Sequence, residues 1–304
     1  MDNLTHTLTG VALSRMGLDR RVSGATLTLA LSSNLPDLDV ASAFWGNVSY
    51  LEHHRGISHA FPLSPVLAMA LAVVLAAWPR STRRFLPTFL LAWLGVSLHI
   101  VWDLWTSYGT RALLPFDSTW YAWDWMFIVD PILLALLAAA SFSRRSAPSQ
   151  SPPRLAAALA LGYLLIRAVA HTQALAQAES LAGPEFTVVR ALPDPVWLNR
   201  WRLLASSREA FVTGYVPAIG ASRSRVAFPR TPSDAMIESV ALESRAARVF
   251  LDFSAFPRLQ TRKENDLTVI VWRDLRFADR RANGFFCEVK VDSALNIVSE
   301  RIVF

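Results

Sequence analysis

The chain has 304 residues, of which 53% are hydrophobic and only 18% are charged, and its mean hydropathy is +0.31. This composition argues against a secreted globular enzyme and is typical of a small polytopic membrane protein with room for a second domain. The formal net charge is +6, but the arginines lie in short runs beside apolar segments, so we expect them to set topology rather than to bind nucleic acid.

Four apolar segments approach or reach the length that crosses a bilayer, which is about 20 residues. They cover residues 62–78, 85–105, 124–142 and 155–175, and two shorter apolar pieces, 4–16 and 22–35, precede them. At ~1.5 Å per residue the short pieces reach only about 20 Å, so they either tilt through a thinned bilayer or form a re-entrant hairpin. The sequence therefore predicts a membrane all-α helical bundle of four long spans plus a short N-terminal helical hairpin.

The placement of arginine predicts the orientation of this bundle. The connections 15–21, 80–84 and 144–154 hold Arg15, Arg20, Arg21, Arg80, Arg83, Arg84, Arg144, Arg145 and Arg154. The alternate connections, 36–61 and 106–123, hold only Arg55 and Arg111. Because basic connections tend to stay in the cytoplasm, we expect a multi-pass protein whose alternate connections face outward, towards the periplasm.

The character of the chain changes after about residue 182, beyond a polar, proline-rich connector at 143–154. Alternating apolar patterns predict strands at 211–216, 267–272, 285–291 and 297–304. Residues 233–250 predict one amphipathic helix with Asp234 in its first turn. We therefore expect a membrane-embedded metal-site domain over 1–180 and a small, soluble, β-rich α+β domain over 183–304 on the outer side.

Five of the six histidines lie within the first 99 residues, each close to an acid, an arginine or another histidine. Charged and imidazole groups are costly at membrane depth, so their recurrence among apolar segments predicts a functional site. Imidazole and carboxylate together are ligands that suit zinc, manganese or iron. The predicted orientation brings all of these groups to the outer face. We expect them to hold one or two divalent ions, zinc being the first choice, through His6, Asp37, His54, His59, His99 and Asp103.

Two of these pairs leave an alternative open. His99 and Asp103 lie one turn apart on one helix face and can bind one ion together, or they form a buried hydrogen bond that holds helices in place. Asp37 and Asp39 follow Pro36 on a turn, where a cation between them would relieve their repulsion. Asp39 could instead cap the next helix, so Asp37 is the stronger prediction.

The segment His53–His59 lacks the glutamate of an HExxH protease site. His54 and His59 are five residues apart, so an irregular turn at Gly56 is needed to bring both to one ion, and His53 is expected to take no part. Arg55 is suited to bidentate contact with a phosphate, and its alternative is to reach the lipid headgroups.

Further polar residues are predicted around the metal. Ser107, Tyr108 and Arg111 follow the His99 helix and are expected to line the substrate pocket, unless their loop is a simple surface turn. Asp39 or Asp130 is expected to position the attacking water, with a helix cap as the alternative for each. Arg167 and His171 are expected to be interfacial or structural.

Four motifs occur in order: MDNLTHTLTG at 1–10, LPDLD at 35–39, HRGISH at 54–59 and HxxxDLWTSYGT at 99–110. Together they resemble the YdjM/YbcI-like family of membrane-bound proteins, to which metal-dependent hydrolysis is attributed. The resemblance covers about residues 1–135 and implies an inner-membrane protein with the six residues given above as its metal-site positions. More weakly, WRDLRF at 272–277 is similar to the extension that some members carry. At the level of pattern alone, the ligand set also resembles zinc-dependent phospholipases C.

The sequence thus predicts a membrane-bound metal-dependent hydrolase, acting on a phosphoester in a lipid or lipid-linked substrate through a metal-activated water. The alternative, from a different class, is a metal-stabilised membrane scaffold or binding protein without catalysis, whose site four ligands would close. The expected partners are the bilayer and the lipid substrate. Nucleic acid is not expected, because the site is predicted to face outward.

Overall fold

The structure is a computed structural model, and it describes residues 1–78, 82–143, 151–221, 225–230, 235–278 and 284–304. The chain forms two compact units, which are described separately. Unit 1 comprises Met1–Asp39, Arg55–Ala174 and Pro193–Trp201, and unit 2 comprises Val40–His54, Leu175–Leu192 and Arg202–Phe304. The units interleave along the chain, whereas the predicted domains, 1–180 and 183–304, follow chain order.

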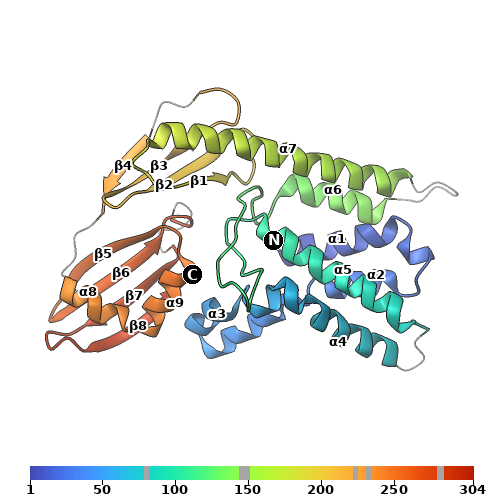
Figure 1. Cartoon of the computed structure of the whole chain (residues 1–304), viewed down its shortest axis with the longest axis horizontal. Helices are drawn as coiled ribbons and strands as arrows, with labels where there is room; N and C mark the ends of the chain where they lie inside the picture. The colour runs from blue at the N-terminus through green and yellow to red at the C-terminus, as the bar shows by residue number, and fades with distance from the viewer. Residues whose placement is uncertain (79–81, 144–150, 222–224, 231–234, 279–283) are drawn as a thin grey trace. The chain divides into compact units, whose positions relative to one another are not determined.

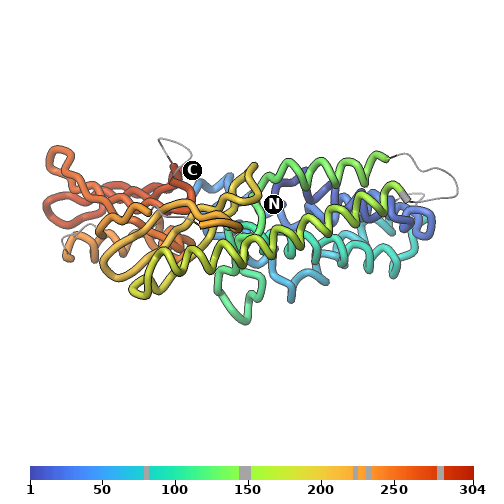
Figure 2. The backbone as a smooth tube through the Cα atoms, turned by 90° about the horizontal axis from the view of Figure 1, so that it is seen from above, coloured from blue at the N-terminus to red at the C-terminus, as the bar shows by residue number. Residues whose placement is uncertain are grey.

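Unit 1 is helical. Its elements are α1 (Asn3–Arg15), η1 (Leu18–Arg20), α2 (Ala25–Ser32), the start of η2 (Pro36–Trp45), η3 (Ile57–His59), η4 (Phe61–Leu63), α4 (Ser64–Ala77), α5 (Phe85–Leu104), α6 (Pro131–Phe142) and the first part of α7 (Ser151–Ala182). α1 packs against α6 and α2, and α5 packs against α2 and α4; α5 and α6 run roughly lengthwise in both views (Figures 1 and 2). The two short helices predicted before the long segments are confirmed as α1 and α2.

Close contact between the helices of unit 1 depends on small residues. A Cβ atom on Gly10 of α1 would lie 2.6 Å from the carbonyl oxygen of Leu29 in α2, so only glycine allows this approach. Gly95 of α5 likewise faces the side chain of Ser32 at the end of α2. These contacts hold α1, α2 and α5 together. α5 carries His99 and Asp103 of the metal centre described below, and α2 precedes Asp37.

Among the described residues, two helices are long and apolar enough to cross a membrane: α5, with 20 residues, and the Pro152–Ala182 part of α7, with 31. A third results if Asn47–His59 and Phe61–Ala77 are counted as one bent span. The prediction of four long spans is therefore wrong. α4 has 14 residues. α6 has 12, because Asp130 caps it and Pro131 begins it, which leaves 124–130 outside the helix.

Unit 2 contains most of two four-stranded sheets. The first has the order β1 (Val188–Pro193), β2 (Trp201–Ser206), β3 (Ala210–Val216) and β4 (Arg225–Pro229), and the second has the order β5 (Pro257–Glu264), β6 (Leu267–Asp274), β7 (Phe286–Val291) and β8 (Ile297–Val303). In the second sheet each strand pairs antiparallel with the next. The helix α9 (Arg245–Phe253) packs on this sheet, where the buried rings of Phe250 and Phe285 lie 4.9 Å apart.

The four predicted strands are confirmed as β3, β6, β7 and β8. The single helix predicted over 233–250 is wrong, because the chain forms α8 (Ala235–Leu242) and then α9. Ser244 separates them by capping α9, where its side chain accepts a hydrogen bond from the backbone of Ala247 at 3.1 Å. Residues 233 and 234, including the predicted Asp234, lie outside the described residues.

Cys287 lies on β7 and is fully buried. Burial, together with the charges of Glu300 and Glu288, raises the pKa of its thiol to about 12. The thiol is therefore protonated at neutral pH, and we assign no nucleophilic role to it.

Candidate metal centre

Four side chains of unit 1 converge on one point: Asp37, His59, His99 and Asp103. One ligand atom from each lies within 4.8 Å of the other three. The Nε2 atoms of His59 and His99 are 3.0 Å apart, and Asp103 Oδ2 lies 3.3 Å from each of them. Asp37 Oδ1 lies 3.3 Å from His59 Nε2 and 3.6 Å from His99 Nε2. The two histidines and Asp103 are buried, and Asp37 lies at the rim.

Local sequence explains how each residue reaches this point. His99 and Asp103 project from the last turns of α5, four residues apart and therefore on one face. Asp37 follows Pro36, which begins the short helix η2 directly after the α2 turn. His59 ends η3, a single 3-10 turn that Gly56 precedes.

The four residues fit a divalent ion. The Nδ1–H of His99 donates to the carbonyl oxygen of Ser33 at 2.7 Å, which leaves its Nε2 lone pair directed at His59 Nε2. Two such lone pairs repel each other unless a proton or a metal ion lies between them. Asp103 Oδ2 is buried and accepts no hydrogen bond from the described residues. A tetrahedral ion with bonds of roughly 2.0–2.1 Å holds its ligands about 3.3 Å apart, which matches the spacings observed here.

His59 is held by Asp39 and Ser58. Its Nδ1 lies 3.2 Å from Asp39 Oδ2 and 2.9 Å from Ser58 Oγ, and Ser58 donates to the same carboxylate oxygen at 2.6 Å. A carboxylate behind a histidine fixes the ring and its tautomer, and this arrangement is common around metal-binding histidines. Asp39 thus supports a ligand here, and its predicted role in positioning water stays a prediction.

Arg55 lies behind Asp103. Its side chain is almost completely buried, and its Nη2 lies 2.9 Å from Asp103 Oδ1, an oxygen that the amino group of Met1 also contacts. Its Nη1 donates to Thr106 Oγ1 at 3.0 Å, and its guanidinium lies 4.8 Å from the ring centre of Tyr108. The backbone of Arg55 adopts a left-handed φ of 60° and donates to Asp39 at 3.0 Å. The guanidinium thus lies against a buried carboxylate, and its predicted contact with a substrate phosphate stays a prediction.

Asp37 has a partner in the first turn of α1. Asn3 Nδ2 donates to Asp37 Oδ2 at 3.1 Å, which leaves Oδ1 for the histidines. When protons rather than a metal ion occupy this group, burial raises the pKa of the Asp37 carboxyl, but the hydrogen bond with His59 and the charge of His99 lower it more, so this pKa lies below its usual value.

The sequence interpretation missed Asn3, Ser33, Ser58 and Thr106. Asn3 and Ser58 stand inside the motifs MDNLTH and HRGISH, so their position next to predicted ligands could have suggested them. The roles of Ser33 and Thr106 depend on helix packing. Ser33 accepts from the distant His99 through its backbone oxygen, and Thr106 accepts from the distant Arg55 through its hydroxyl.

Of the other predicted ligands, His6 lies beside the group, and His54 belongs to unit 2. The ring of His6 stacks on His99 with 3.8 Å between centroids, and its Nε2 lies 3.4 Å from Asp103 Oδ1. His54 closes α3 (Asn47–His53), is counted with unit 2, and stacks on Tyr50 at 4.8 Å. The ligand roles of His6 and His54 stay predictions. His53 pairs its Nδ1 with the backbone of Ser49, in keeping with the expectation that it takes no part.

Asp130 is engaged in structural contacts. Its Oδ1 accepts from the backbone of Ile132 and Leu133 at the start of α6, and its Oδ2 accepts from the hydroxyl of Tyr163 at 2.7 Å. These contacts match the cap that was the alternative prediction, and no observation tests the catalytic one.

Ser107, Tyr108 and Arg111 lie in the loop after α5. The backbone N–H of Arg111 donates to the carbonyl oxygen of Arg55 at 3.0 Å, and its guanidinium lies 4.7 Å from the ring centre of Trp120. The loop is therefore tied to the segment that carries Arg55, and the substrate contacts stay predictions.

Arg167 and His171 of α7 both contact Trp201. The buried guanidinium of Arg167 lies 4.6 Å from the ring centre of Trp201 and donates from Nε to the carbonyl oxygen of Trp125 at 3.0 Å. The His171 ring meets Trp201 edge-on at 5.4 Å. Both residues pack within unit 1, in keeping with the structural role predicted for them.

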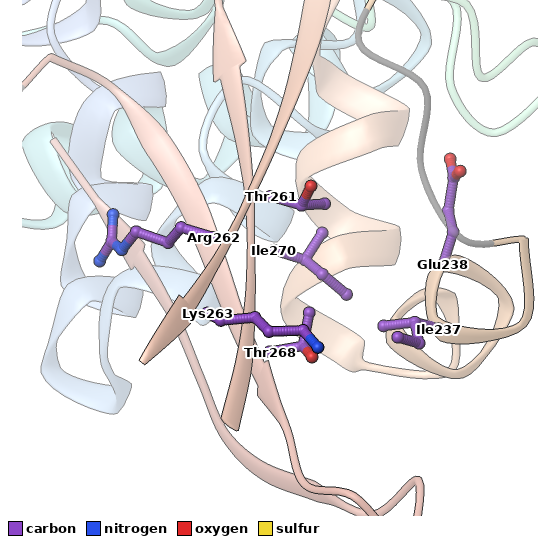
Figure 3. A pocket seen from close by; sticks show the side chains of 7 residues that line it. All are labelled: Ile237, Glu238, Thr261, Arg262, Lys263, Thr268 and Ile270. Carbon is purple, nitrogen blue, oxygen red and sulfur yellow. The ribbon is translucent and has the colours of Figure 1, made fainter. Parts of the chain in front are cut away.

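Unit 2 has a pocket of about 320 Å³ between α8 and the strands β5 and β6, lined by Ile237, Glu238, Thr261, Arg262, Lys263, Thr268 and Ile270 (Figure 3). Arg262 pairs with Glu264 at 2.8 Å and with Glu288 at 3.2 Å. The lining contains no histidine or cysteine and only one acid, so we place the metal chemistry in unit 1.

Comparison with known proteins identifies the family of the chain. A family model described as YdjM inner membrane protein matches residues 1–174, and one described as YfhP C-terminal alpha/beta plait domain matches residues 236–303. The chain is also similar to the uncharacterized protein YfhP of Bacillus subtilis (strain 168). The two are 26% identical over 315 residues, which cover 98% of this chain and 94% of that protein. No solved structure matches the chain. The first match covers more than half of the chain and contains all four residues of the metal centre.

Proposed function

The chain belongs to the YdjM inner membrane protein family, and we propose that it is a membrane-bound, metal-dependent hydrolase. The proposed substrate is a phosphoester in a lipid or a lipid-linked molecule. The observation that carries the proposal is the convergence of Asp37, His59, His99 and Asp103, whose ligand atoms lie within 4.8 Å of one another. A divalent ion held there, zinc by preference and manganese or iron as alternatives, would supply a bound water of lowered pKa and polarise the phosphoryl oxygen.

The residues around the group have distinct tasks in this proposal. His59, His99 and Asp103 hold the ion from the buried side, and Asp37, whose side chain is 14% exposed, closes it at the rim where a substrate can enter. Asp39 fixes the His59 ring. Arg55 balances the charge of Asp103, so the contact with the substrate phosphate passes to Arg111 or to the ion.

Exposed apolar side chains in the chain segments that carry or follow the metal-site residues favour a lipid substrate over a soluble one. Leu38, which stands between the two aspartates, is 67% exposed, and Phe44 and Trp45 at the end of the same short helix η2 are 91% and 76% exposed. In the loop after α5, Phe116 is 84% exposed. Such side chains suit the interface between membrane and water, where lipid phosphoesters lie.

One observation favours the alternative, a metal-stabilised scaffold without catalysis. Four ligands complete a tetrahedral shell, and a structural zinc site has no open position for water. A catalytic site on the same residues requires either that one of the four leaves the ion or that the ion takes more than four ligands.

Activity of the purified chain in detergent tests the two functions against each other. The chain would be stripped of metal, reloaded with zinc, manganese or iron, and assayed with phospholipids, a polyprenyl phosphate and a soluble aryl phosphate. We expect hydrolysis of a lipid ester that depends on metal and is lost in His99→Ala. Full metal occupancy without hydrolysis of any ester would contradict the enzyme and support the scaffold.

We also propose that the metal centre and unit 2 face the periplasm. α5 begins directly after Arg83 and Arg84 and ends beside His99 and Asp103, and α7 carries Arg154 in its first turn. Arg80, Arg144 and Arg145, which entered the sequence prediction, lie outside the described residues. Both long spans thus begin at a basic end, and the positive-inside rule places that end in the cytoplasm.

Reporter fusions check this orientation. Alkaline phosphatase fused after Phe304 should be active, and a fluorescent protein that folds only in the cytoplasm should stay dark at the same position. The matched control is a truncation after Arg84, where the two reporters should exchange their behaviour. The reverse pattern at both positions would overturn the orientation.

A further inference from the structure

Unit 1 has a cavity of about 390 Å³ at the end of α1 that lies away from the metal centre. Its apolar lining comes from Leu13, Met16 and Leu18, and its charged lining comes from Arg20, Arg21 and Arg154. α1 carries His6, which stacks on His99, in its first turn and ends at Arg15, so the metal centre and the cavity lie at opposite ends of this helix. The connection from α1 to α2 lies at this end.

The chain builds this cavity from a glycine turn and a helix start. Gly17, at a φ of 123°, lets the chain leave α1 and enter the short helix η1. Leu13 and Leu18 pack against the buried cluster that contains Leu29. On the other side, Ala156 of α7 belongs to the same buried cluster as Ala12 of α1, and this packing brings the first turn of α7 to the cavity.

The three arginines of the cavity are exposed, and no acid is among the described residues that line the cavity with them. In the described part of the chain, none of their guanidinium groups makes an ion pair or a side-chain hydrogen bond. The neighbouring Arg15, by contrast, donates to the carbonyl oxygen of Ser143 at 3.1 Å. Three like charges around one cavity repel one another, and an anion between them removes that repulsion.

The lining indicates the chemistry of the ligand. Guanidinium groups bind phosphate in a bidentate manner, and the apolar floor next to them suits the first carbons of an acyl chain rather than a fully hydrated ion. The cavity lies where α7, which is long and apolar enough to cross a membrane, begins. Basic pockets between membrane helices are typical sites for anionic lipid headgroups.

We propose that this cavity binds the headgroup phosphate of an anionic phospholipid, through Arg20, Arg21 and Arg154, with Leu13, Met16 and Leu18 against the start of its acyl chains. The site is separate from the metal centre, and the inference does not depend on the proposed hydrolase activity.

Equilibrium titration of the full chain in a neutral detergent tests the site. The probes are dioctanoyl phosphatidylglycerol, dioctanoyl phosphatidylcholine and inorganic phosphate. We expect saturable binding of the phosphatidylglycerol, weak binding of the phosphatidylcholine and no binding of phosphate at the same concentration. The triple variant Arg20→Gln, Arg21→Gln, Arg154→Gln should weaken phosphatidylglycerol binding on the order of 100-fold, since each arginine near an anionic lipid contributes about fivefold.

The matched control removes three positive charges elsewhere, in the variant Arg208→Gln, Arg248→Gln, Lys263→Gln, and should keep the affinity of the unchanged chain. An equal loss of phosphatidylglycerol affinity in both triple variants would show that net charge alone causes the effect, and would overturn the site. Phosphate binding as tight as phosphatidylglycerol binding would replace the lipid by a soluble anion. If the triple variant does not fold, the single variant Arg154→Gln replaces it in the titration. This variant should keep its circular dichroism and metal content and bind phosphatidylglycerol about fivefold more weakly.

Discussion

The purified His99→Ala protein should lose its bound metal, with the affinity reduced more than about 100-fold, because removal of a ligand costs more than the 10- to 100-fold that a supporting residue contributes. The Nε2 atom of His99 is held in place by the contact of Nδ1 with Ser33, and it lies 3.0 Å from the Nε2 atom of His59. Asp103→Ala should have the same effect on the metal. Elemental analysis of protein purified in detergent measures the ratio of metal to chain.

Two comparison variants make this measurement specific. Asp39→Asn weakens the carboxylate that supports His59, so the affinity should fall about 10- to 100-fold and the metal should return at high concentration. His53→Ala should leave the metal content unchanged, because its ring pairs with the backbone of Ser49. Normal metal content in both His99→Ala and Asp103→Ala would show that the four residues do not form the site.

Arg55→Met should destabilise the metal-free protein by about 1–3 kcal/mol, because it removes one of the two positively charged groups, the guanidinium of Arg55 and the amino group of Met1, that contact the buried carboxylate of Asp103. Asp103 is completely buried, and the guanidinium of Arg55 lies 2.9 Å from its Oδ1. A metal ion on Oδ2 supplies positive charge to the same carboxylate, so the loss of stability should be smaller when the metal is bound. Thermal unfolding in detergent, with and without added zinc, measures the difference.

The matched control is Arg111→Met, which removes an arginine of the same predicted substrate set whose guanidinium lies over Trp120. Added zinc should raise the unfolding temperature of Arg111→Met by less than it raises that of Arg55→Met. If Arg55→Met keeps both stability and metal content but loses activity, Arg55 binds the substrate, as the sequence predicted, and does not serve to balance Asp103.

Residue type and spacing alone were enough to find the members of the metal centre. The four-residue spacing of His99 and Asp103 places them on one helix face in any α-helix, and Asp37 and His59 stand out because acids and histidines are costly among apolar segments. The alternation of apolar residues likewise predicted β3, β6, β7 and β8, because side chains of a strand alternate between its two faces. The polar edge strand β5 has no such alternation and was missed.

Packing decided what these local signals could not. Hydropathy cannot distinguish a long span from a shorter helix that follows an irregular segment. It therefore predicts a span over 124–142, although Asp130 caps α6 and the helix begins only at Pro131. Nor can spacing along the chain show which distant residues meet. The meeting of Asp37 with Asp103 depends on the close approach of α2 and α5 at Gly95, and the pairing of Arg55 with Asp103 joins two segments that are distant in the chain. These contacts between distant segments exist only in the folded chain. The free energy of a buried charge likewise depends on everything packed around it, so it cannot be read from the sequence.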